Sequence, residues 1–235
     1  PPLDGGLDYQ LGGAYPPGAG VAIVSRDRTA APAPGLYNIC YVNGFQIQPT
    51  EEAWWRAQHD DLILRTAGGV EVVDREWNEL LLDVSTLAKR TAIAQIVGEW
   101  IAGCKQAGFD AIEIDNLDSF SRSQGLLAEA DAVATMQLFA AAAHGHGMAI
   151  AQKNSAELVV RRTEMSTDFV VAEECNRYSE CGVYTAAYGE HVLMIEYRAQ
   201  DFEAGCAAYG KRFSIVLRDL PLVAKGSAGY VYRGC

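Results

Sequence analysis

The sequence predicts one α/β domain over residues 1–235, a single (β/α)8 barrel with one extra strand. Short runs rich in β-branched residues alternate with longer amphipathic segments, and no linker or internal repeat interrupts them. That alternation fits a closed barrel or an open doubly wound sheet. Two further observations favour the barrel. The glycine-rich stretch at 12–18 lacks the dinucleotide fingerprint, and polar residues stand at the carboxyl end of strand after strand, where barrel active sites are built.

Nine segments have the length and composition of strands. They are 8–11, 21–25, 36–42, 80–84, 111–115, 148–152, 169–173, 192–197 and 214–217. Because a barrel has eight places, we expect one of the nine to be an edge insertion or not a strand.

The clearest helix is predicted over 85–107, with Gly108 as its stop signal. Apolar residues recur there at three- and four-residue steps, namely Ile93, Ile96, Val97, Trp100, Ile101 and Cys104. Further helices are predicted over 126–143, 51–58, 155–163 and 201–209. One face of the 85–107 helix is expected to pack inward.

Composition and charge exclude several classes of protein. The chain is 49% hydrophobic and 21% charged, which is typical of a globular protein. Its 19 Lys and Arg against 30 Asp and Glu give a net charge of −11, which argues against nucleic acid and suits a cationic partner. No run approaches the ~18 apolar residues of a membrane span. The chain begins Pro1-Pro2 without a charged-then-apolar leader, and we expect any signal peptide to have been removed.

Six cysteines are scattered along the chain, and none forms a C-x-x-C pair. An even number of widely spaced cysteines favours three disulfides and secretion, with buried thiols as the alternative. The pairing that we hypothesise is Cys175 with Cys181 across a short loop, Cys206 with Cys235 at the C-terminus, and Cys40 with Cys104.

The segment 111–118 carries the strongest chemical signal. Strand alternation places Glu113 and Asp115 inside the barrel, with Asp115 nearer the mouth, and turns Ile112 and Ile114 toward the helices. Two inward carboxylates are costly unless they are neutralised or hydrogen-bonded. A buried network with Lys153 or Arg218 is the structural explanation, and catalysis is the functional one that we favour.

A second acidic strand end contains Glu173 and Glu174. Consecutive residues of a strand point to opposite faces, so at most one of them faces the barrel interior, and alternation alone does not choose between them. Together with Asp115, one of these glutamates gives two carboxylates at one mouth, the arrangement used for glycoside hydrolysis. Acids at a barrel mouth also bind metals, which is the alternative.

A series of motifs stands in order along the chain, most of them at expected strand ends. They are DYQLG (8–12), VSRDR (24–28), ICYVN (39–43) with FQIQP (45–49), EIDNLD (113–118), QKN (152–154), EEC (173–175) and EY (196–197). Over nearly the whole chain these motifs resemble glycoside hydrolase family 114, the endo-α-1,4-polygalactosaminidases. The resemblance implies a secreted barrel that acts with retention on galactosamine polymers. It also implies that Asp115 is the nucleophile and Glu173 the acid/base, with Glu174 in reserve.

Other polar strand ends are candidates to line the sugar subsites. They are Asp8, Gln10, Tyr41, Asp83, Lys153, Asn154, Glu196, Tyr197 and Asp219. Each has an alternative role as a hydrogen-bonding residue of the core. Lys153 would repel a cationic substrate unless it pairs with an acid such as Glu113 or Glu196.

The four tryptophans, Trp54, Trp55, Trp77 and Trp100, are candidate stacking platforms for sugar rings. Of these, we expect Trp100 to lie in the core and Trp77 to pack beneath the barrel.

The leading hypothesis is a secreted, monomeric, endo-acting hydrolase of a cationic amino-sugar polysaccharide, without cofactor or metal. One alternative is a glycosidase that acts on another α-linked polymer, with or without N-acetyl groups. The other is a secreted sugar-binding barrel without turnover, which two opposed acids disfavour.

Overall fold

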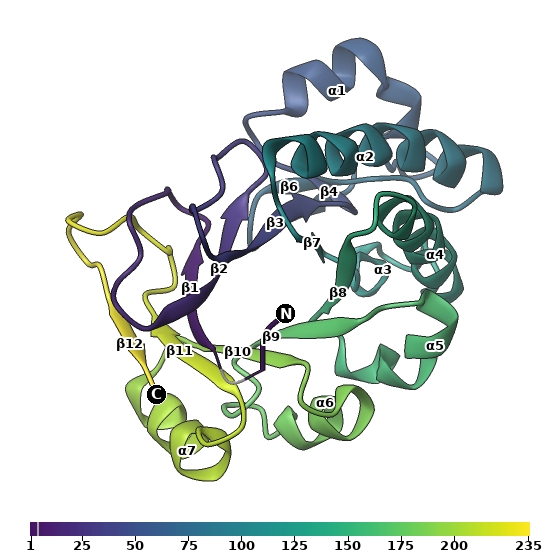
Figure 1. Cartoon of the computed structure of the whole chain (residues 1–235). Coiled ribbons are helices and arrows are strands. Elements are labelled where there is room, and N and C mark those ends of the chain that lie inside the picture. Colours follow the sequence, from purple (N-terminus) through teal and green to yellow (C-terminus); the bar gives the residue numbers. More distant parts are fainter. Residues whose placement is uncertain (4) are drawn as a thin grey trace.

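Eight parallel strands form a ring that helices surround on most of its circumference (Figure 1). The computed structural model describes residues 1–3 and 5–235. The ring contains, in spatial order, β1 (Gly6–Gln10), β2 (Val21–Asp27), β3 (Tyr37–Asn43), β7 (Ala111–Asp115), β8 (Ala149–Lys153), β9 (Phe169–Glu173), β10 (Val192–Glu196) and β11 (Ser214–Arg218). β1 and β11 lie side by side, and the Ser214 hydroxyl donates to the Gly5 carbonyl at that seam. The predicted (β/α)8-type barrel is therefore confirmed.

Alternation along each strand divides the apolar residues into an inner and an outer core. Inward residues such as Ile39, Val171 and Ile195 fill the barrel. Outward residues such as Ile112 and Ile114 pack against the helices. The polar inward residues lie toward the carboxyl ends of the strands, which places the chemistry at one mouth of the barrel.

The two long helices form where periodicity predicts them. α2 (Leu87–Ala107) begins at Thr86, whose hydroxyl accepts the Lys89 N–H at 3.3 Å, and ends at Gly108 with a left-handed φ of 101°. α4 (Glu129–Gly145) packs beside it. The shorter helices are α1 (Glu52–Gln58), α3 (Ser119–Arg122), α5 (Arg162–Met165), α6 (Cys181–Tyr188) and α7 (Ala199–Tyr209), with 3₁₀ turns at Asp60–Leu62 and Ala156–Arg161.

Two helical predictions differ from the structure. The segment 155–163 is a 3₁₀ turn followed by α5, because Asn154 and Ser155 both take left-handed φ values, of 46° and 59°, and the chain restarts after them. α6 has only eight residues and begins at a disulfide-bonded cysteine, and the sequence analysis missed it.

The extra predicted strand, 80–84, lies outside the barrel. It contributes to β6 (Glu79–Leu81), the central strand of a small antiparallel sheet with β4 (Gln46–Ile47) and β5 (Val73–Asp74). This accessory sheet is inserted between β3 and α2, as the edge-insertion alternative predicts. Leu80 and Leu81 are buried there, which explains why the run reads like a barrel strand.

Loops rather than helices connect β1 to β2 (11–20) and β2 to β3 (28–36). This side of the barrel is covered by the C-terminal strand β12 (Tyr232–Gly234), which pairs antiparallel with β11. The Tyr232 side chain packs against Val21 and Val24, and its hydroxyl donates to the Leu7 carbonyl at 3.3 Å. The C-terminal segment thus covers the wall that no helix covers.

Three disulfides join the pairs that the sequence analysis expects. Cys40 of β3 is bonded to Cys104 of α2, the Cys175–Cys181 bridge closes the loop after β9, and Cys206 of α7 holds Cys235. Over the described residues, the helices are all too short or too polar to cross a bilayer.

Candidate active site

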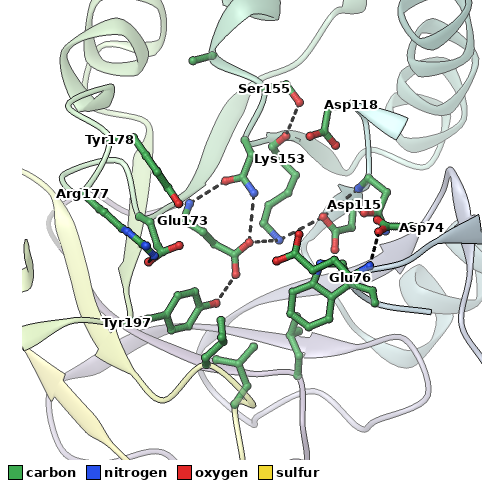
Figure 2. Close-up of a pocket in the computed structure, with 18 of the residues that line it drawn as sticks. Asp74, Glu76, Asp115, Asp118, Lys153, Ser155, Glu173, Arg177, Tyr178 and Tyr197 are labelled. Atoms are coloured by element: carbon green, nitrogen blue, oxygen red, sulfur yellow. Dashed lines mark hydrogen bonds and ion pairs between the residues drawn. The ribbon is translucent and has the colours of Figure 1, made fainter. Parts of the chain in front are cut away.

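A cavity of about 980 Å³ opens at the carboxyl ends of the barrel strands (Figure 2). Its floor is formed by the ends of β3, β7, β8, β9 and β10, and its walls by the accessory sheet, the loop after β9 and residues 220–222. The volume lies at the upper end of the range for small-ligand sites. The cavity therefore has room for more than one sugar ring.

Asp115, the last residue of β7, lies on the cavity floor and is held on both oxygens. Its Oδ2 accepts a hydrogen bond from the Tyr41 hydroxyl at 2.6 Å, and its Oδ1 accepts the backbone N–H of Asn116 at 2.9 Å. Asn116 takes a left-handed φ of 62°, which turns that N–H back toward the carboxylate. The side chain is thereby fixed in one orientation at the mouth.

Glu173, the last residue of β9, faces Asp115 across the cavity floor (Figure 2). Its Oε1 accepts a hydrogen bond from the Tyr197 hydroxyl, and its Oε2 accepts one from Asn154 Nδ2 at 3.2 Å. Glu174 also lines the cavity but turns toward the loop, where it forms an ion pair with Arg177 at 2.6 Å. Of the two glutamates, Glu173 is the one that converges with Asp115.

Lys153, the last residue of β8, joins the two carboxylates. Its Nζ lies 3.3 Å from Asp115 Oδ1 and 3.2 Å from Glu173 Oε2, and only 2% of its side chain is exposed. Those two oxygens therefore lie no more than 6.5 Å apart, the sum of the two distances. Both carboxylates are thus held on one buried ammonium.

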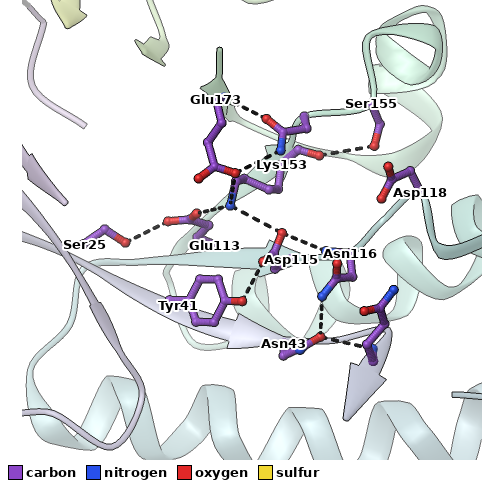
Figure 3. Close-up of polar contacts among 12 residues, drawn as sticks. Ser25, Tyr41, Asn43, Glu113, Asp115, Asn116, Asp118, Lys153, Ser155 and Glu173 are labelled. Atoms are coloured by element: carbon purple, nitrogen blue, oxygen red, sulfur yellow. Dashed lines mark hydrogen bonds and ion pairs between the residues drawn. The ribbon is translucent and has the colours of Figure 1, made fainter. Parts of the chain in front are cut away.

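A third carboxylate, Glu113, supports Lys153 from below (Figure 3). Its side chain is fully buried, and it lies 3.2 Å from Lys153 Nζ. Glu113 also accepts hydrogen bonds from the hydroxyls of Tyr9 and Ser25, the latter at 2.7 Å. The structure therefore contains the buried network with Lys153 that the sequence analysis weighed as an alternative, and this network supports the mouth.

The pKa values of the buried residues in this cluster shift in different directions. Burial by itself raises the pKa of Asp115, but the Lys153 charge and the hydrogen bonds from Tyr41 and Asn116 outweigh it and hold the pKa below its usual value. Burial raises the pKa of Glu113 despite Lys153. Burial by itself lowers the pKa of Lys153, yet the surrounding carboxylates bring it well above its usual value. At neutral pH Asp115 is ionised beside a charged lysine.

The structure brings four of the nine candidate binding residues to the cavity: Tyr41, Lys153, Asn154 and Tyr197. The other five do not line it. Asp8 and Gln10 are buried in a network with Tyr15 and Arg26.

The remaining three have structural partners elsewhere. Asp83 accepts from Ser85 and Lys89 at the start of α2, Glu196 accepts from Asn176 under the loop after β9, and Asp219 accepts backbone N–H groups of Val223 and Val231. These five residues, Asp8 and Gln10 included, are not part of the site proposed below.

The sequence analysis missed the contribution of the β5–β6 hairpin. Glu76, Trp77 and Glu79 all line the cavity from this hairpin, and Trp77 is 55% exposed. The expectation that Trp77 packs beneath the barrel is wrong, because the accessory sheet carries it to the mouth. Trp100 is only partly buried, with the Arg28 guanidinium 4.1 Å from its ring centroid. The sequence contained one signal for this hairpin: Trp77 stands between two glutamates, Glu76 and Glu79.

Within the described residues, the one group of three close potential metal ligands is Cys175, Cys181 and Glu196. Both sulfurs are committed to a disulfide, so this group is unsuited to a metal.

The model of the glycoside-hydrolase family GH114 matches residues 1–235. The crystal structure of Ega3 from Aspergillus fumigatus in complex with galactosamine is similar, with a TM-score of 0.78, 21% identity, and coverage of 100% of this chain and 96% of that chain. The glycoside hydrolase domain of PelA from Pseudomonas aeruginosa has a TM-score of 0.63 at 14% identity, covering 95% and 98%.

The α-galactosidase TtGalA from Thermus thermophilus, in complex with p-nitrophenyl α-D-galactopyranoside, has a TM-score of 0.55 at 12% identity, covering 96% of this chain and 60% of that chain. No curated protein sequence matches significantly. The match over the whole chain decides the assignment: this protein is a glycoside hydrolase and belongs to glycoside-hydrolase family GH114.

Proposed function

We propose that this glycoside hydrolase cleaves α-1,4 bonds inside galactosamine polymers with retention of the anomeric configuration. The observation that supports it most is the convergence of Asp115 and Glu173 on Lys153, which leaves at most 6.5 Å between the two oxygens that contact it. Retaining enzymes hold their carboxyl groups about 5 Å apart and inverting enzymes roughly 6.5–9.5 Å. The spacing favours the retaining mechanism.

In the first step, an Asp115 oxygen attacks the anomeric carbon while protonated Glu173 donates its proton to the glycosidic oxygen. The bond between that oxygen and the anomeric carbon breaks, one part of the polymer leaves with a new hydroxyl, and an ester to Asp115 remains. In the second step, a water molecule attacks the same carbon, Glu173 accepts its proton, and the ester breaks. Two inversions at one carbon give net retention.

Local contacts support these roles. Lys153 and Tyr41 favour the ionised form of Asp115, which is the form that attacks. Once the ester forms, Asp115 no longer carries a charge, and the Lys153 ammonium remains 3.2 Å from the Glu173 carboxyl group that accepts the proton of the attacking water. Glu174 is the weaker candidate for the acid/base because its carboxylate turns to Arg177 in the loop, whereas Glu173 shares Lys153 with Asp115.

The substrate class is inferred from the family and from the cavity. The related Ega3 structure contains galactosamine. Acidic residues outnumber basic ones in the cavity wall of this chain, which suits a polymer of protonated amino sugars. Trp77 and Tyr178 are exposed in that wall and offer apolar faces to sugar rings. An N-acetylated α-linked polymer is the alternative substrate, and binding without turnover is the alternative function.

We also propose that the protein acts outside the cell as a monomer. Three disulfides are typical of an oxidising compartment. Fractionation of the source culture tests the location, and light scattering of the purified protein tests the oligomeric state.

Hydrolysis of a defined α-1,4-galactosamine polymer tests the activity. We expect release of internal fragments with new reducing ends, initially in the α configuration by NMR. Asp115→Asn is expected to lower turnover by about 1,000-fold or more with an unchanged fold. A first product in the β configuration, or wild-type turnover in Asp115→Asn, contradicts the mechanism.

Azide rescue distinguishes the two glutamates. Glu173→Gln is expected to lose polymer cleavage, yet to cleave a substrate with an activated aryl leaving group faster when azide is added, because azide needs no base to attack the ester. Glu174→Gln is the matched control and is expected to keep most of the activity. The opposite result for the two variants assigns the acid/base to Glu174.

A further inference from the structure

We propose that Glu79 binds the C2 ammonium of the sugar whose anomeric carbon faces Asp115, and that it thereby selects free amino sugars over neutral or N-acetylated ones. The inference rests on the proposed function for the orientation of that sugar. Glu79 belongs to the accessory sheet. This sheet is separate from the sheet that forms the barrel.

The accessory sheet delivers Glu79 to the cavity in a defined position. Glu79 is the first residue of β6 and lies opposite Asp74 of β5, whereas the next two residues, Leu80 and Leu81, are buried. Because the leucines anchor the strand in the core, the glutamate is presented from a rigid element rather than from a mobile loop. Glu79 lines the cavity together with Asp115.

Two asparagines hold one oxygen of Glu79 next to the nucleophile. Oε2 accepts hydrogen bonds from Asn43 Nδ2 at 2.9 Å and from Asn116 Nδ2 at 3.3 Å. Asn43 is the register partner of Asp115 between β3 and β7, and Asn116 follows Asp115 directly. The two asparagines also contact each other at 3.0 Å (Figure 3). The Glu79 carboxylate is therefore one hydrogen bond away from the residue after the nucleophile.

The second oxygen of Glu79, Oε1, accepts no hydrogen bond from the part of the chain that the structure describes. Three of the neighbouring acids are already committed. Glu113 is enclosed by Lys153 and two hydroxyls, and Asp74 and Asp118 share the Arg122 guanidinium at 2.9 and 2.8 Å. Glu76 also lines the cavity, but Glu79 is the acid that Asn43 and Asn116 hold beside the nucleophile, and its Oε1 is therefore the oxygen that we assign to the ligand.

In a galactosamine unit positioned for attack by Asp115, we expect the C2 amine to lie near the Glu79 carboxylate. C2 is bonded directly to the anomeric carbon, so its substituent must lie beside whatever attacks that carbon. An ammonium between Asp115 and Glu79 pairs with both carboxylates, whereas an acetamide at the same place offers no charge and more bulk. Burial, with the charges of Asp115 and Asp74, raises the pKa of Glu79 to about 7 even though Asn43 opposes the rise, and a bound ammonium favours the ionised form.

Equilibrium binding tests the inference independently of hydrolysis. Galactosamine, galactose and N-acetylgalactosamine are titrated separately into the wild type, Glu79→Gln and Glu157→Gln by calorimetry. Glu157 is an exposed acid on another part of the cavity wall, so its variant removes the same charge without disturbing Asn43 or Asn116. Glutamine keeps an oxygen that accepts from both asparagines.

We expect the wild type to prefer galactosamine over galactose, and Glu79→Gln to reduce that preference about tenfold or more while leaving the dissociation constant of galactose within about threefold. Glu157→Gln is expected to change the preference less than threefold. On polymer, the wild-type kcat/KM for the free-amine substrate is expected to rise as pH increases through about 7, and Glu79→Gln is expected to lose this rise.

An equal loss of galactose and galactosamine binding in Glu79→Gln overturns the inference, because Glu79 then supports the site without binding the amine selectively. Equal effects of Glu79→Gln and Glu157→Gln also overturn it, since general attraction would explain both. A Glu79-dependent galactosamine preference in a protein that hydrolyses no polymer supports the amine site and refutes the proposed function.

Discussion

Lys153 is almost fully buried, and its charge is balanced by three carboxylates, Glu113, Asp115 and Glu173. Any one of these acids alone would suffice to neutralise a buried lysine. Three acids around one ammonium are more than its neutralisation requires, and among the residues that the structure describes Lys153 is the one cation that contacts all three of them. This answers the sequence-based concern about a cation near a cationic substrate, because the lysine is paired on every side. Its partners include Glu113 as expected and do not include Glu196.

Replacing Lys153 with methionine removes the ammonium and keeps most of the volume. We expect turnover at pH 7 to fall about 100-fold, because both catalytic carboxyl groups lose the ammonium that fixes their positions. The pKa of Asp115 is expected to rise without Lys153, so the acidic limb of the kcat/KM profile should move to higher pH. A profile that keeps its acidic limb in place shows that Lys153 does not control Asp115.

Glu79 has a predicted effect on stability that depends on pH. Its folded-state pKa of about 7 exceeds its usual value of 4.5, so between these values the folded state binds more protons than the unfolded state. The ionised carboxylate therefore costs stability above pH 7, and the cost vanishes below pH 4.5. Glu79→Gln is expected to stabilise the protein by about 2 kcal/mol at pH 8, discounted for the open cavity, and hardly at all at pH 4.5.

Urea midpoints of wild type and Glu79→Gln across this pH range check the prediction. Glu157→Gln serves again as the control for loss of one surface charge. A stability difference that does not depend on pH shows that the Glu79 carboxylate is not destabilised in the folded protein.

At the scale of elements, the loop after β9 connects the acid/base to the disulfide. Cys175 lies two residues after Glu173 and is bonded to Cys181 at the start of α6. Asn176 in this loop donates twice to Glu196, both times at 2.9 Å. Glu196 was expected in a sugar subsite, and its place beneath the loop indicates instead that it supports Glu173 indirectly.

Removing this bridge with Cys175→Ser and Cys181→Ser is expected to lower turnover more than stability. A ring with a sequence separation of 6 contributes about 2 kcal/mol through the unfolded state, compared with about 4 kcal/mol for the separation of 64 between Cys40 and Cys104. The double variant of Cys40 and Cys104 is the control, expected to lose more stability and less turnover at a temperature where both proteins are folded. The reverse order of effects would mean that the loop bridge serves stability alone.

At the scale of the whole molecule, the net charge of −11 and the acidic cavity create a negative potential toward which a polycation is attracted. The screening length falls from about 10 Å at 0.1 M salt to about 3 Å at 1 M. We expect kcat/KM for the free-amine polymer to fall severalfold across this range, and kcat/KM for a heavily acetylated polymer to change little. Equal responses of the two polymers leave solubility as the role of the charge.

Local patterns account for most of the architecture. Alternation in 111–115 identified the inward acids, three- and four-residue spacing identified α2 and α4, and the cysteine positions suggested the observed pairs. Alternation and helical spacing depend on residues that are close together in the chain. The Cys40–Cys104 pair followed because only these two cysteines remained once the other four had been paired. The order of the motifs then pointed to the family that the whole-chain match establishes.

The tertiary structure decided which polar strand ends share the mouth. Alternation could not choose between Glu173 and Glu174, and it could not tell Tyr41 in the cavity from Asp8 in a buried network. Glu79 reached the site because a hairpin between β3 and α2 folds back over the barrel. The physical reason is that periodicity gives the face on which a side chain lies, whereas its hydrogen-bond partners come from strands and insertions distant in sequence, and only their packing brings those atoms within reach.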